Sequence, residues 1–185
     1  MKKSLFLILK PFLRLLFRAF FHKKYLSSEY FDDSRGYIWC LRAIISRNLL
    51  RLNVQLPFPC HHSFNITDWR NLDFNPDDIH NFQSQGCYFQ CSKAKITLGK
   101  RCYIGPNVAV ITANHNPCNL EEHNEGKPVY ISENCWIGFG SVILPGVYLA
   151  PGTVVAANSV VTKSVFEGAF LIAGSPAKKI KRYDV

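Results

Sequence analysis

The chain contains six histidines, the side chains best suited to proton transfer at neutral pH because an unperturbed imidazole has a pKa of about 6.5. Four of them have no motif around them: His22, His61, His62 and His80. His115 differs, since it lies in the stretch ITANHNP at the point where a regular repeat of the sequence stops. We therefore predict that His115 is a general base. The alternative is a loop histidine that only forms hydrogen bonds.

Seven cysteines could provide a different chemistry, the binding of a metal. Cys87 and Cys91 are four residues apart, and Cys60 precedes His61 and His62. Neither group has a second half at the spacing of a zinc site. The number of cysteines is odd and no secretory signal precedes them, so we expect reduced thiols in a cytoplasmic protein. Most of them should be buried as small hydrophobic side chains, and no metal is expected.

The element that must position His115 is a repeat with a period of six residues. A first series of aliphatic residues recurs at this spacing, and a second series follows four residues after each member of the first. The first series is Ile131, Ile137, Ile143, Leu149, Val155 and Val161, and the second is Cys135, Ser141, Val147, Thr153, Ser159 and Val165. Glycine, proline, alanine and asparagine between them mark turns. The same period is present at Leu98, Ile104 and Val110, and it breaks over the 21 residues from Val110 to Ile131.

A period of six with aliphatic residues pointing inward predicts short strands wound into a β-solenoid. Three hexapeptides form one triangular coil, and each coil buries its aliphatic face only by stacking on the next. A β-sandwich is the alternative, but its strands recur at spacings of about 8 to 12 residues with irregular turns. The unbroken six-residue register therefore favours the solenoid.

The formal charge of +9 is concentrated at the N-terminus of the 185-residue chain. Residues 1–24 contain seven lysines and arginines and no acid, so the remaining residues contribute 9 − 7 = +2. This distribution argues against a nucleic acid as partner, since only a terminal segment is basic.

The N-terminal segment predicts an amphipathic helix. Lys10, Arg14 and Arg18 recur at the spacing of one helical face, with phenylalanine and leucine on the other faces and Pro11 in the first turn. Lys10 and Pro11 interrupt the apolar run too early for a signal peptide or a membrane-spanning helix. Two hypotheses stay open. The helix lies on the inner face of the cytoplasmic membrane, or its apolar face packs on the protein or on a neighbouring subunit.

The stretch ISENCWIGFGSVILPGVYLAPGTVVAANSVVTKSV, followed by AGSPAKKIKR, resembles the hexapeptide-repeat acyltransferases, in particular their galactoside, maltose, serine and polysaccharide O-acetyltransferase branch. The resemblance implies an all-β fold, a left-handed parallel β-helix, assembled as a homotrimer with acetyl-coenzyme A as co-substrate. It divides the chain into an N-terminal helical segment (1–59), a β-helix (60–165) with an extended loop (114–129), and a C-terminal tail packed on the β-helix (166–185).

The resemblance also implies roles for individual residues. It places the catalytic histidine at His115, directly before the extended loop. The expected contacts with the coenzyme are Phe139, Gly140, Ala157, Thr162, Lys163 and Lys178, and the expected substrate-side residues are Gln85, Asn114, Asn116 and His123. Relatives often have a second histidine or an acid just after the first. Asparagines flank His115 here, so the group that orients it is either a glutamate of the loop or a backbone carbonyl.

These observations predict an O-acetyltransferase that acts on a sugar hydroxyl, in surface polysaccharide or lipopolysaccharide assembly if the basic segment meets the membrane. Within the same class, the alternatives are an amino-sugar N-acetyltransferase and a serine acetyltransferase. A different alternative is a zinc protein resembling the gamma-type carbonic anhydrases, which needs at least two histidines in the coils. A β-helix without catalysis is the last one, and the AGSPAK segment and His115 count against it.

Overall fold

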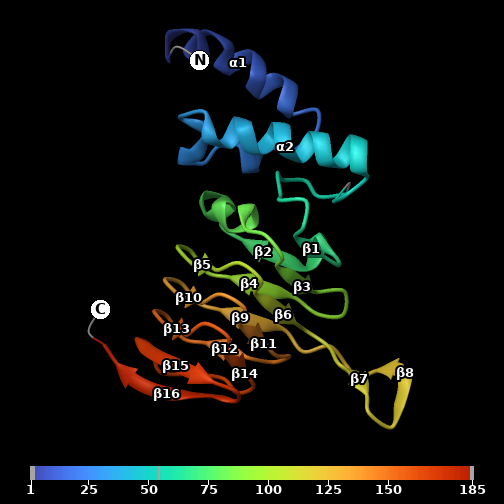
Figure 1. Cartoon of the computed structure of the whole chain (residues 1–185), viewed down its shortest axis with the longest axis vertical. Helices are drawn as coiled ribbons and strands as arrows, with labels where there is room; N and C mark the ends of the chain where they lie inside the picture. The colour runs from blue at the N-terminus through green and yellow to red at the C-terminus, as the bar shows by residue number, and fades with distance from the viewer. Residues whose placement is uncertain (1–2, 54, 184–185) are drawn as a thin grey trace.

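The computed structural model describes residues 3–53 and 55–183. Short strands stack in successive coils, and two helices lie at the N-terminal end of the stack, α1 (Lys3–Phe17) and α2 (Arg35–Leu50) (Figure 1). The strands of the coils are β1 (Asn65–Ile66), β2 (Leu72–Phe74), β3 (Tyr88–Gln90), β4 (Ile96–Leu98), β5 (Tyr103–Ile104), β6 (Ala109–Ile111), β9 (Val129–Ile131), β10 (Trp136–Ile137), β11 (Val142–Ile143), β12 (Tyr148–Leu149), β13 (Val154–Val155), β14 (Val160–Val161) and β15 (Phe170–Gly174).

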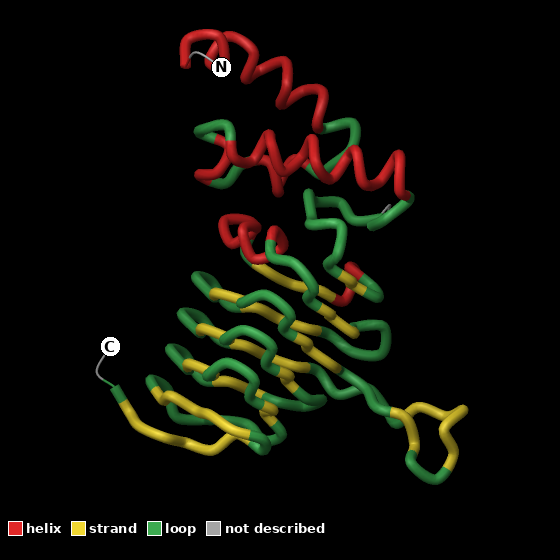
Figure 2. The backbone as a smooth tube through the Cα atoms, viewed as in Figure 1, coloured by secondary structure: helices red, strands yellow, loops and turns green. Residues whose placement is uncertain are grey.

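The strands form three parallel sheets, which are the three sides of the β-helix (Figure 2). Sheet A has the order β1-β3-β6-β11-β14, sheet B the order β2-β4-β9-β12, and sheet C contains β5-β10-β13-β15. From β4 to β14, successive strands of the coils go from sheet B to sheet C to sheet A and back to sheet B. The three edges between them are named here the B–C, C–A and A–B edges. A parallel β-helix with hexapeptide coils is the fold expected from the sequence.

The two series of repeated residues form the core of the β-helix. All their members are buried, with at most 7% of the side chain exposed, at Val165. Ile143, for example, lies in register between Val110 of the previous coil and Val161 of the next. Each buried aliphatic side chain contributes about 1.5–3 kcal/mol, but only because a neighbouring coil covers it.

The turns at the C–A edge repeat the same backbone conformation from coil to coil. At the C–A edge the φ angle is positive, from 57° to 73°, at Gly86, Asn107, Gly140 and Asn158, which occupy equivalent positions of successive coils. Glycine and asparagine adopt this left-handed conformation at the lowest cost. The small residues of the repeat are therefore explained by turn geometry.

Two 3₁₀ helices, η1 (Lys23–Leu26) and η2 (Glu29–Phe31), connect α1 to α2, and residues 3–53 are named here the helical cap. The cap has its own apolar cluster, with Phe17 and Phe31 fully buried against Tyr37 and Cys40. Aromatic rings also join the cap to the first coils, since Tyr25 stacks on Phe74 with ring centroids 5.3 Å apart.

The prediction that Pro11 lies in the first turn of the helix is wrong. α1 begins at Lys3, so Pro11 lies inside it. A proline in a helix interior costs about 3 kcal/mol, because a hydrogen bond is lost and the ring meets the preceding turn. Phe6, which lies before the proline, is nevertheless buried and packs edge-on against Tyr37 with ring centroids 5.3 Å apart. This tertiary contact holds the segment N-terminal to Pro11 in the helix.

The apolar residues of α1 are divided between two sides of the helix. Phe6, Leu13 and Phe17 pack inside the helical cap, in one cluster with residues of α2. One of the two hypotheses for this segment was that its apolar face packs on the protein. Phe12 and Leu15 are 69% and 67% exposed. Among the described residues, no helix is long and apolar enough to cross a membrane.

Two hairpins depart from the regular coils. The strands β7 (His115–Asn116) and β8 (Asn119–His123) pair antiparallel within the segment that interrupts the repeat. At the C-terminus, β15 pairs with β13 as part of the last coil, and β16 (Ala177–Arg182) folds back antiparallel on β15. The extended loop of the sequence is therefore a two-stranded hairpin, and the tail adds an outer strand to sheet C.

Candidate active site at two edges of the β-helix

His115 lies on the β7–β8 hairpin, which projects from the A–B edge away from the body of the molecule (Figure 1). The chain leaves the coils after β6 and returns at β9, so the hairpin replaces an ordinary turn of this edge. Its base is closed by two backbone hydrogen bonds, from Asn124 N to Asn114 O and from Lys127 N to Thr112 O, both 2.8 Å long. A rigid coil edge therefore holds a hairpin whose side chains are exposed.

The imidazole of His115 is oriented by a backbone carbonyl. Its Nδ1 lies 2.7 Å from the carbonyl oxygen of Leu120 on β8. Since a carbonyl oxygen can only accept, Nδ1 carries the hydrogen of the neutral ring and Nε2 has a free lone pair. This is the tautomer that a general base needs at Nε2. Of the two orienting groups that the sequence left open, the structure has the carbonyl, and Glu122 instead accepts a 3.3 Å hydrogen bond from Asn116.

His123 lies directly across the hairpin from His115. The two imidazole rings are 4.1 Å apart between centroids, at an interplanar angle of 38°. Asn124 adds a side-chain hydrogen bond of 3.3 Å to the carbonyl of His115. The residue proposed as catalytic and one of those proposed as substrate-side are thus neighbours on one exposed surface.

A cavity of about 360 Å³ lies between the base of the hairpin and the A–B edge. Asn114, Asn124 and Lys127 line it from the hairpin side, and Pro145 and Thr162 line it from the coils. Lys163 follows Thr162 and is exposed. Part of the residue set proposed for the coenzyme therefore lies on the same edge as His115.

The rest of the proposed coenzyme residues lie on the C–A edge. Phe139 and Gly140 are in the turn between β10 and β11, and Ala157 is in the equivalent turn one coil later. These turns stack closely, because Asn158 N donates to Phe139 O at 2.8 Å. A β-carbon at Gly138 would lie 2.7 Å from the backbone nitrogen of Ala157, so the edge has no room for a larger residue there.

Two further residues belong to the C–A edge. Gln85 lies in the first turn of this edge, where its carbonyl accepts from Asn107 N at 3.0 Å. Lys178 lies opposite Ala173 on the C-terminal hairpin, whose tip reaches the edge through a hydrogen bond from Gly174 N to Ser159 Oγ.

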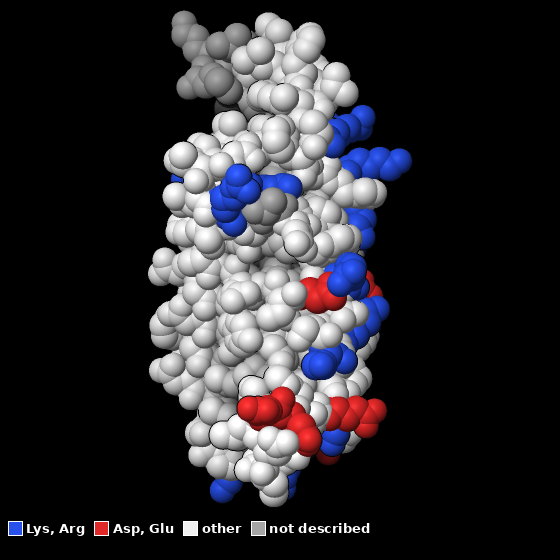
Figure 3. Space-filling model, turned by 90° about the vertical axis from the view of Figure 1, so that its right-hand side faces the viewer, with Lys and Arg blue, Asp and Glu red and all other residues white. Residues whose placement is uncertain are grey.

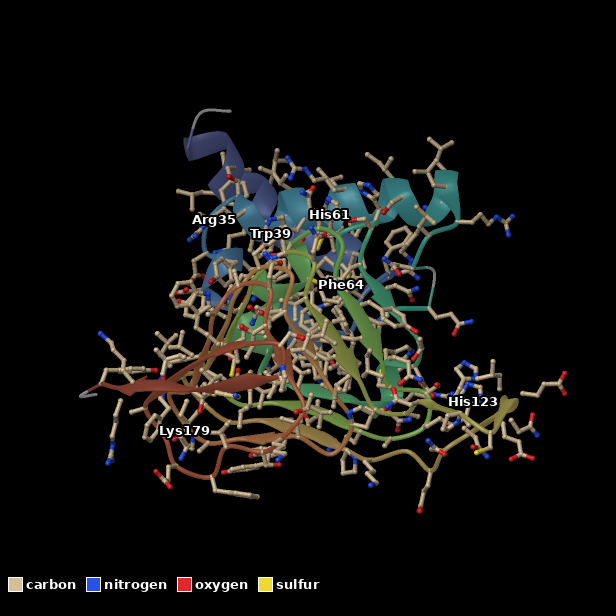
Figure 4. All side chains as sticks on the ribbon, turned by 60° about the horizontal axis from the view of Figure 1, so that its bottom comes forward. Arg35, Trp39, His61, Phe64, His123 and Lys179 are labelled. Carbon is tan, nitrogen blue, oxygen red and sulfur yellow. The ribbon has the colours of Figure 1, made fainter. Side chains whose placement is uncertain are left out.

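The structure thus divides the proposed residues into two groups, with sheet A between them. Asn114, His115, Asn116, His123, Thr162 and Lys163 lie at the A–B edge, and Gln85, Phe139, Gly140, Ala157 and Lys178 lie at the C–A edge. Figure 4 shows His123 on the hairpin at one side of the molecule, away from Lys179 of β16. Within one chain, the two groups do not meet.

Sequence reasoning missed the carbonyl of Leu120 and the side chain of Asn124. A backbone carbonyl has no signal in the residue types, and Asn124 looks like an ordinary loop residue. His80 was also given no role, yet it is enclosed between the rings of Tyr30 and Tyr103, at centroid distances of 5.6 and 5.1 Å. Burial lowers the pKa of His80 from its ordinary 6.5, and the nearby Asp78 carboxylate opposes that shift.

The cysteines have no role in either group. Six of the seven are buried as free thiols, and only Cys118 of the hairpin is exposed. Burial raises the pKa of the Cys40 thiol to about 12 and raises that of Cys60 as well. Within residues 3–53 and 55–183, no three His, Cys, Asp or Glu side chains are grouped as a metal site would require.

Comparison with known proteins identifies the repeat. Residues 128–163 match the family model described as bacterial transferase hexapeptide (six repeats). A crystal structure of a hexapeptide-repeat acetyltransferase from Vibrio cholerae in complex with acetyl coenzyme A is 32% identical, with a TM-score of 0.51 over 55% of this chain and 56% of that one. Residues 128–163 are therefore hexapeptide repeats, and the fold is a left-handed parallel β-helix, as the resemblance in the sequence implied.

The curated relatives are acetyltransferases by name. A putative acetyltransferase of Schizosaccharomyces pombe is 39% identical over 107 residues, which are 56% of this chain and 50% of the relative. A putative acetyltransferase of Saccharomyces cerevisiae is 35% identical over 133 residues, which are 70% of this chain and 62% of the relative. The chain thus matches between about half and under two thirds of the length of these relatives.

Proposed function

We propose that this protein is an acetyl-coenzyme A dependent O-acetyltransferase that modifies a sugar hydroxyl. The observation that carries the proposal is the orientation of His115, whose Nδ1 donates to Leu120 O at 2.7 Å and whose Nε2 is left free on an exposed hairpin. The similarity to acetyltransferases supports the same conclusion.

His115 acts in both halves of the reaction. Nε2 accepts the proton of the acceptor hydroxyl while the hydroxyl oxygen attacks the thioester carbonyl. The hydrogen bond from Nδ1 to Leu120 O becomes charge-assisted when the ring is protonated, and it stabilises the imidazolium. The same Nε2 then returns the proton to the departing thiolate, so that the acetyl ester and the free thiol form with no net change of protons.

The donor lies along the C–A edge in this proposal, and the active site is shared by two copies of a homotrimer. An extended thioester arm can lie along the edge at Phe139, Gly140 and Ala157. Gly140 leaves room for it, because glycine has no β-carbon. The nucleotide end meets Lys178 of the copy that binds the donor and Thr162 and Lys163 of the neighbouring copy, where the ammonium groups neutralise its phosphates. Since the two edges of one chain do not meet, His115 of one copy faces the C–A edge of its neighbour.

The acceptor contacts are Asn114, Asn116, His123 and Gln85. The first three lie on the hairpin with His115, and Gln85 lies on the C–A edge. Their amide and imidazole groups are suited to bind hydroxyl groups of a carbohydrate. The acceptor belongs to surface polysaccharide or lipopolysaccharide assembly, in the cytoplasm, with residues 1–24 at the inner face of the membrane.

The test is an assay of coenzyme A release. Purified full-length protein is mixed with acetyl-coenzyme A and a panel of hexoses and hexosamines, and the free thiol is followed for the wild type and for His115→Ala. His22→Ala is the control, because this exposed histidine lies in the helical cap. We expect release with a hexose and its loss in His115→Ala only. Full activity in His115→Ala contradicts the role of His115, and release that needs an amino group assigns the protein to N-acetyl transfer.

A further inference from the structure

From Phe6 to Phe17, the exposed side of α1 is apolar. Its exposed side chains are large and hydrophobic, with exposed fractions from 54% to 69%: Leu7, Ile8, Phe12, Leu15 and Leu16. Contiguous apolar surface of this kind on a folded protein marks a site of interaction. An ordinary surface helix has the opposite arrangement, with charged residues toward water.

Lys10 and Arg14 of α1 turn toward the rest of the cap. Lys10 forms a 3.3 Å ion pair with Asp32, and its side chain is only 24% exposed. Arg14 donates to the carbonyl of Leu26 through both Nε and Nη2, at 3.2 and 2.7 Å. The sequence left open whether this helix lies on a membrane or packs on the protein, and in the structure Lys10 and Arg14 form contacts within the cap. The apolar side is the one that is free to meet a partner.

α2 continues the same surface. Ile38, Leu41, Ile45 and Leu49 recur along one side of this helix and are from 43% to 76% exposed. A groove of about 720 Å³ joins the two helices, with Leu7 and Leu9 on one wall and Ile38 and Leu41 on the other. We name the exposed apolar residues of α1 and α2 together the cap surface. The groove connects them through Ile38 and Leu41, and Asp32 and Asp33 also line it.

Residues 1–53 carry most of the net positive charge of the chain. Residues 1–53 contain eleven lysines and arginines and three acids, which is 11 − 3 = +8 of the total +9. Two of these acids are paired, Asp32 with Lys10 and Asp33 with Arg35. Figure 3 shows uncharged atoms at the tip of the helical end, Lys and Arg side chains beside and below them, and acidic side chains farther down this face.

We propose that the cap surface docks on an anionic lipid surface, with α1 and α2 both immersed in the headgroup region. An apolar area bordered by lysine and arginine fits such a surface, because acyl chains take the apolar side chains and lipid phosphates attract the basic ones. A second copy of the chain fits less well, since two segments 1–53 of charge +8 would repel each other. This inference names the residues of the membrane contact that the proposed function includes. It does not depend on acetyl transfer.

The docked orientation leaves the candidate active site in solution. The cap lies at the opposite end of the coils from β15 and β16, and the hairpin with His115 projects from the side of the stack (Figure 1). Each copy of a C₃ trimer with its axis along the coils would present its cap on the same side. The three caps of one trimer would then bind the membrane together, with a higher affinity than one cap alone.

The experiment is sedimentation of the full-length protein with vesicles of phosphatidylcholine alone or mixed with phosphatidylglycerol. We expect binding to the mixed vesicles that weakens as salt rises. Phe12→Glu and Ile45→Glu should each reduce the binding by about tenfold or more, since each removes an exposed side chain worth about 1.5–3 kcal/mol in an apolar phase. Phe166→Glu is the matched control, because this phenylalanine is 78% exposed far from the cap.

Three outcomes would overturn the proposal: no binding of the wild type to mixed vesicles, unchanged binding in Ile45→Glu, or a cap variant that changes the molecular mass in solution instead. The last outcome assigns the surface to a second copy. Thiol release with a soluble sugar is measured on the same samples, and Phe12→Glu should leave it unchanged. Loss of vesicle binding with retained release, or the reverse, separates this inference from the proposed acetyl transfer.

Discussion

The A–B edge and the C–A edge of the β-helix are built in different ways. The A–B edge is interrupted by a hairpin, and it exposes polar side chains such as Asn114 and His115. The C–A edge continues without interruption, and its turns repeat one left-handed position from Gly86 to Asn158. One edge therefore presents side chains that can do chemistry, whereas the other presents a backbone of constant shape.

This difference shows how a repetitive fold can support a specific reaction. Stacked turns alone offer a groove or ridge without reactive groups, and an inserted hairpin alone has no surface to bind an extended donor. A functional site needs both. Because sheet A separates the two edges in one chain, the site that we propose would be assembled only between copies.

The largest effect is expected from a change at the A–B edge. His115→Ala should reduce kcat by about 10²–10⁴-fold, the usual contribution of a general base. The Kd for acetyl-coenzyme A should stay within about threefold of the wild type, because the donor lies mainly on the C–A edge. Calorimetric titration with the coenzyme and steady-state kinetics measure the two quantities. A parallel loss of donor binding would contradict the division of labour between the edges.

A bulky residue on the C–A edge should give the opposite result. Ala157→Trp is expected to raise the KM for acetyl-coenzyme A by about 10- to 100-fold, since the indole occupies the path of the donor. Stability should change little, because Ala157 is exposed. Glu133→Trp is the control, which places the same side chain in an exposed turn of the B–C edge. Equal KM values for the two variants would remove the donor from the C–A edge.

A smaller effect is expected from Asn124, which supports the hairpin rather than the reaction. Asn124→Ala removes the 3.3 Å hydrogen bond to the carbonyl of His115. A hydrogen bond of this kind contributes about 0.5–1.5 kcal/mol, so kcat should fall by about 2- to 10-fold. The pH profile of kcat should keep its shape, since the imidazole itself still donates to Leu120 O. A shifted profile would mean that Asn124 acts on the protonation of His115 instead.

The smallest effect concerns His80, which lies at the junction with the helical cap and away from both edges. Burial lowers its pKa below 6.5 in the folded protein, against the opposing influence of Asp78 and Glu29. The folded state therefore binds fewer protons than the unfolded state just below pH 6.5, and stability falls as the pH drops through this range.

In His80→Phe this part of the acid sensitivity should be absent, because the phenyl ring can pack between Tyr30 and Tyr103 without a charge. Thermal melts at neutral and mildly acidic pH measure the effect, which should be a few degrees or less. If the stability of His80→Phe falls at acidic pH as much as that of the wild type, other groups cause the acid sensitivity. Activity should follow the wild type at neutral pH, as expected for a residue outside the site.

The coils could be predicted from the sequence because their signal is repeated. Six aliphatic positions such as Ile131 and Val161 share one period, and each coil confirms the register of the last. The helical cap lacks this redundancy. Pro11 favoured a helix start by local rules, and the buried contact of Phe6 with Tyr37 overrode them.

The candidate site could be predicted only in part. The break in the repeat indicated His115, since an interruption is visible against a regular background. The carbonyl of Leu120 could not be predicted, because any residue supplies a carbonyl and only the pairing of β7 with β8 brings this one to Nδ1. The division of the residues between two edges also required the order of the sheets, which residue spacing alone does not give.

The most direct test of the account is to mix the two edge variants. His115→Ala and Ala157→Trp are each purified, dissociated together, reassociated, and assayed for thiol release at a limiting concentration of acetyl-coenzyme A. If His115 of one copy faces the C–A edge of its neighbour, about a quarter of the sites in an equal mixture combine two intact edges and activity reappears. A mixture that stays as inactive as the separate variants would contradict a site shared between copies.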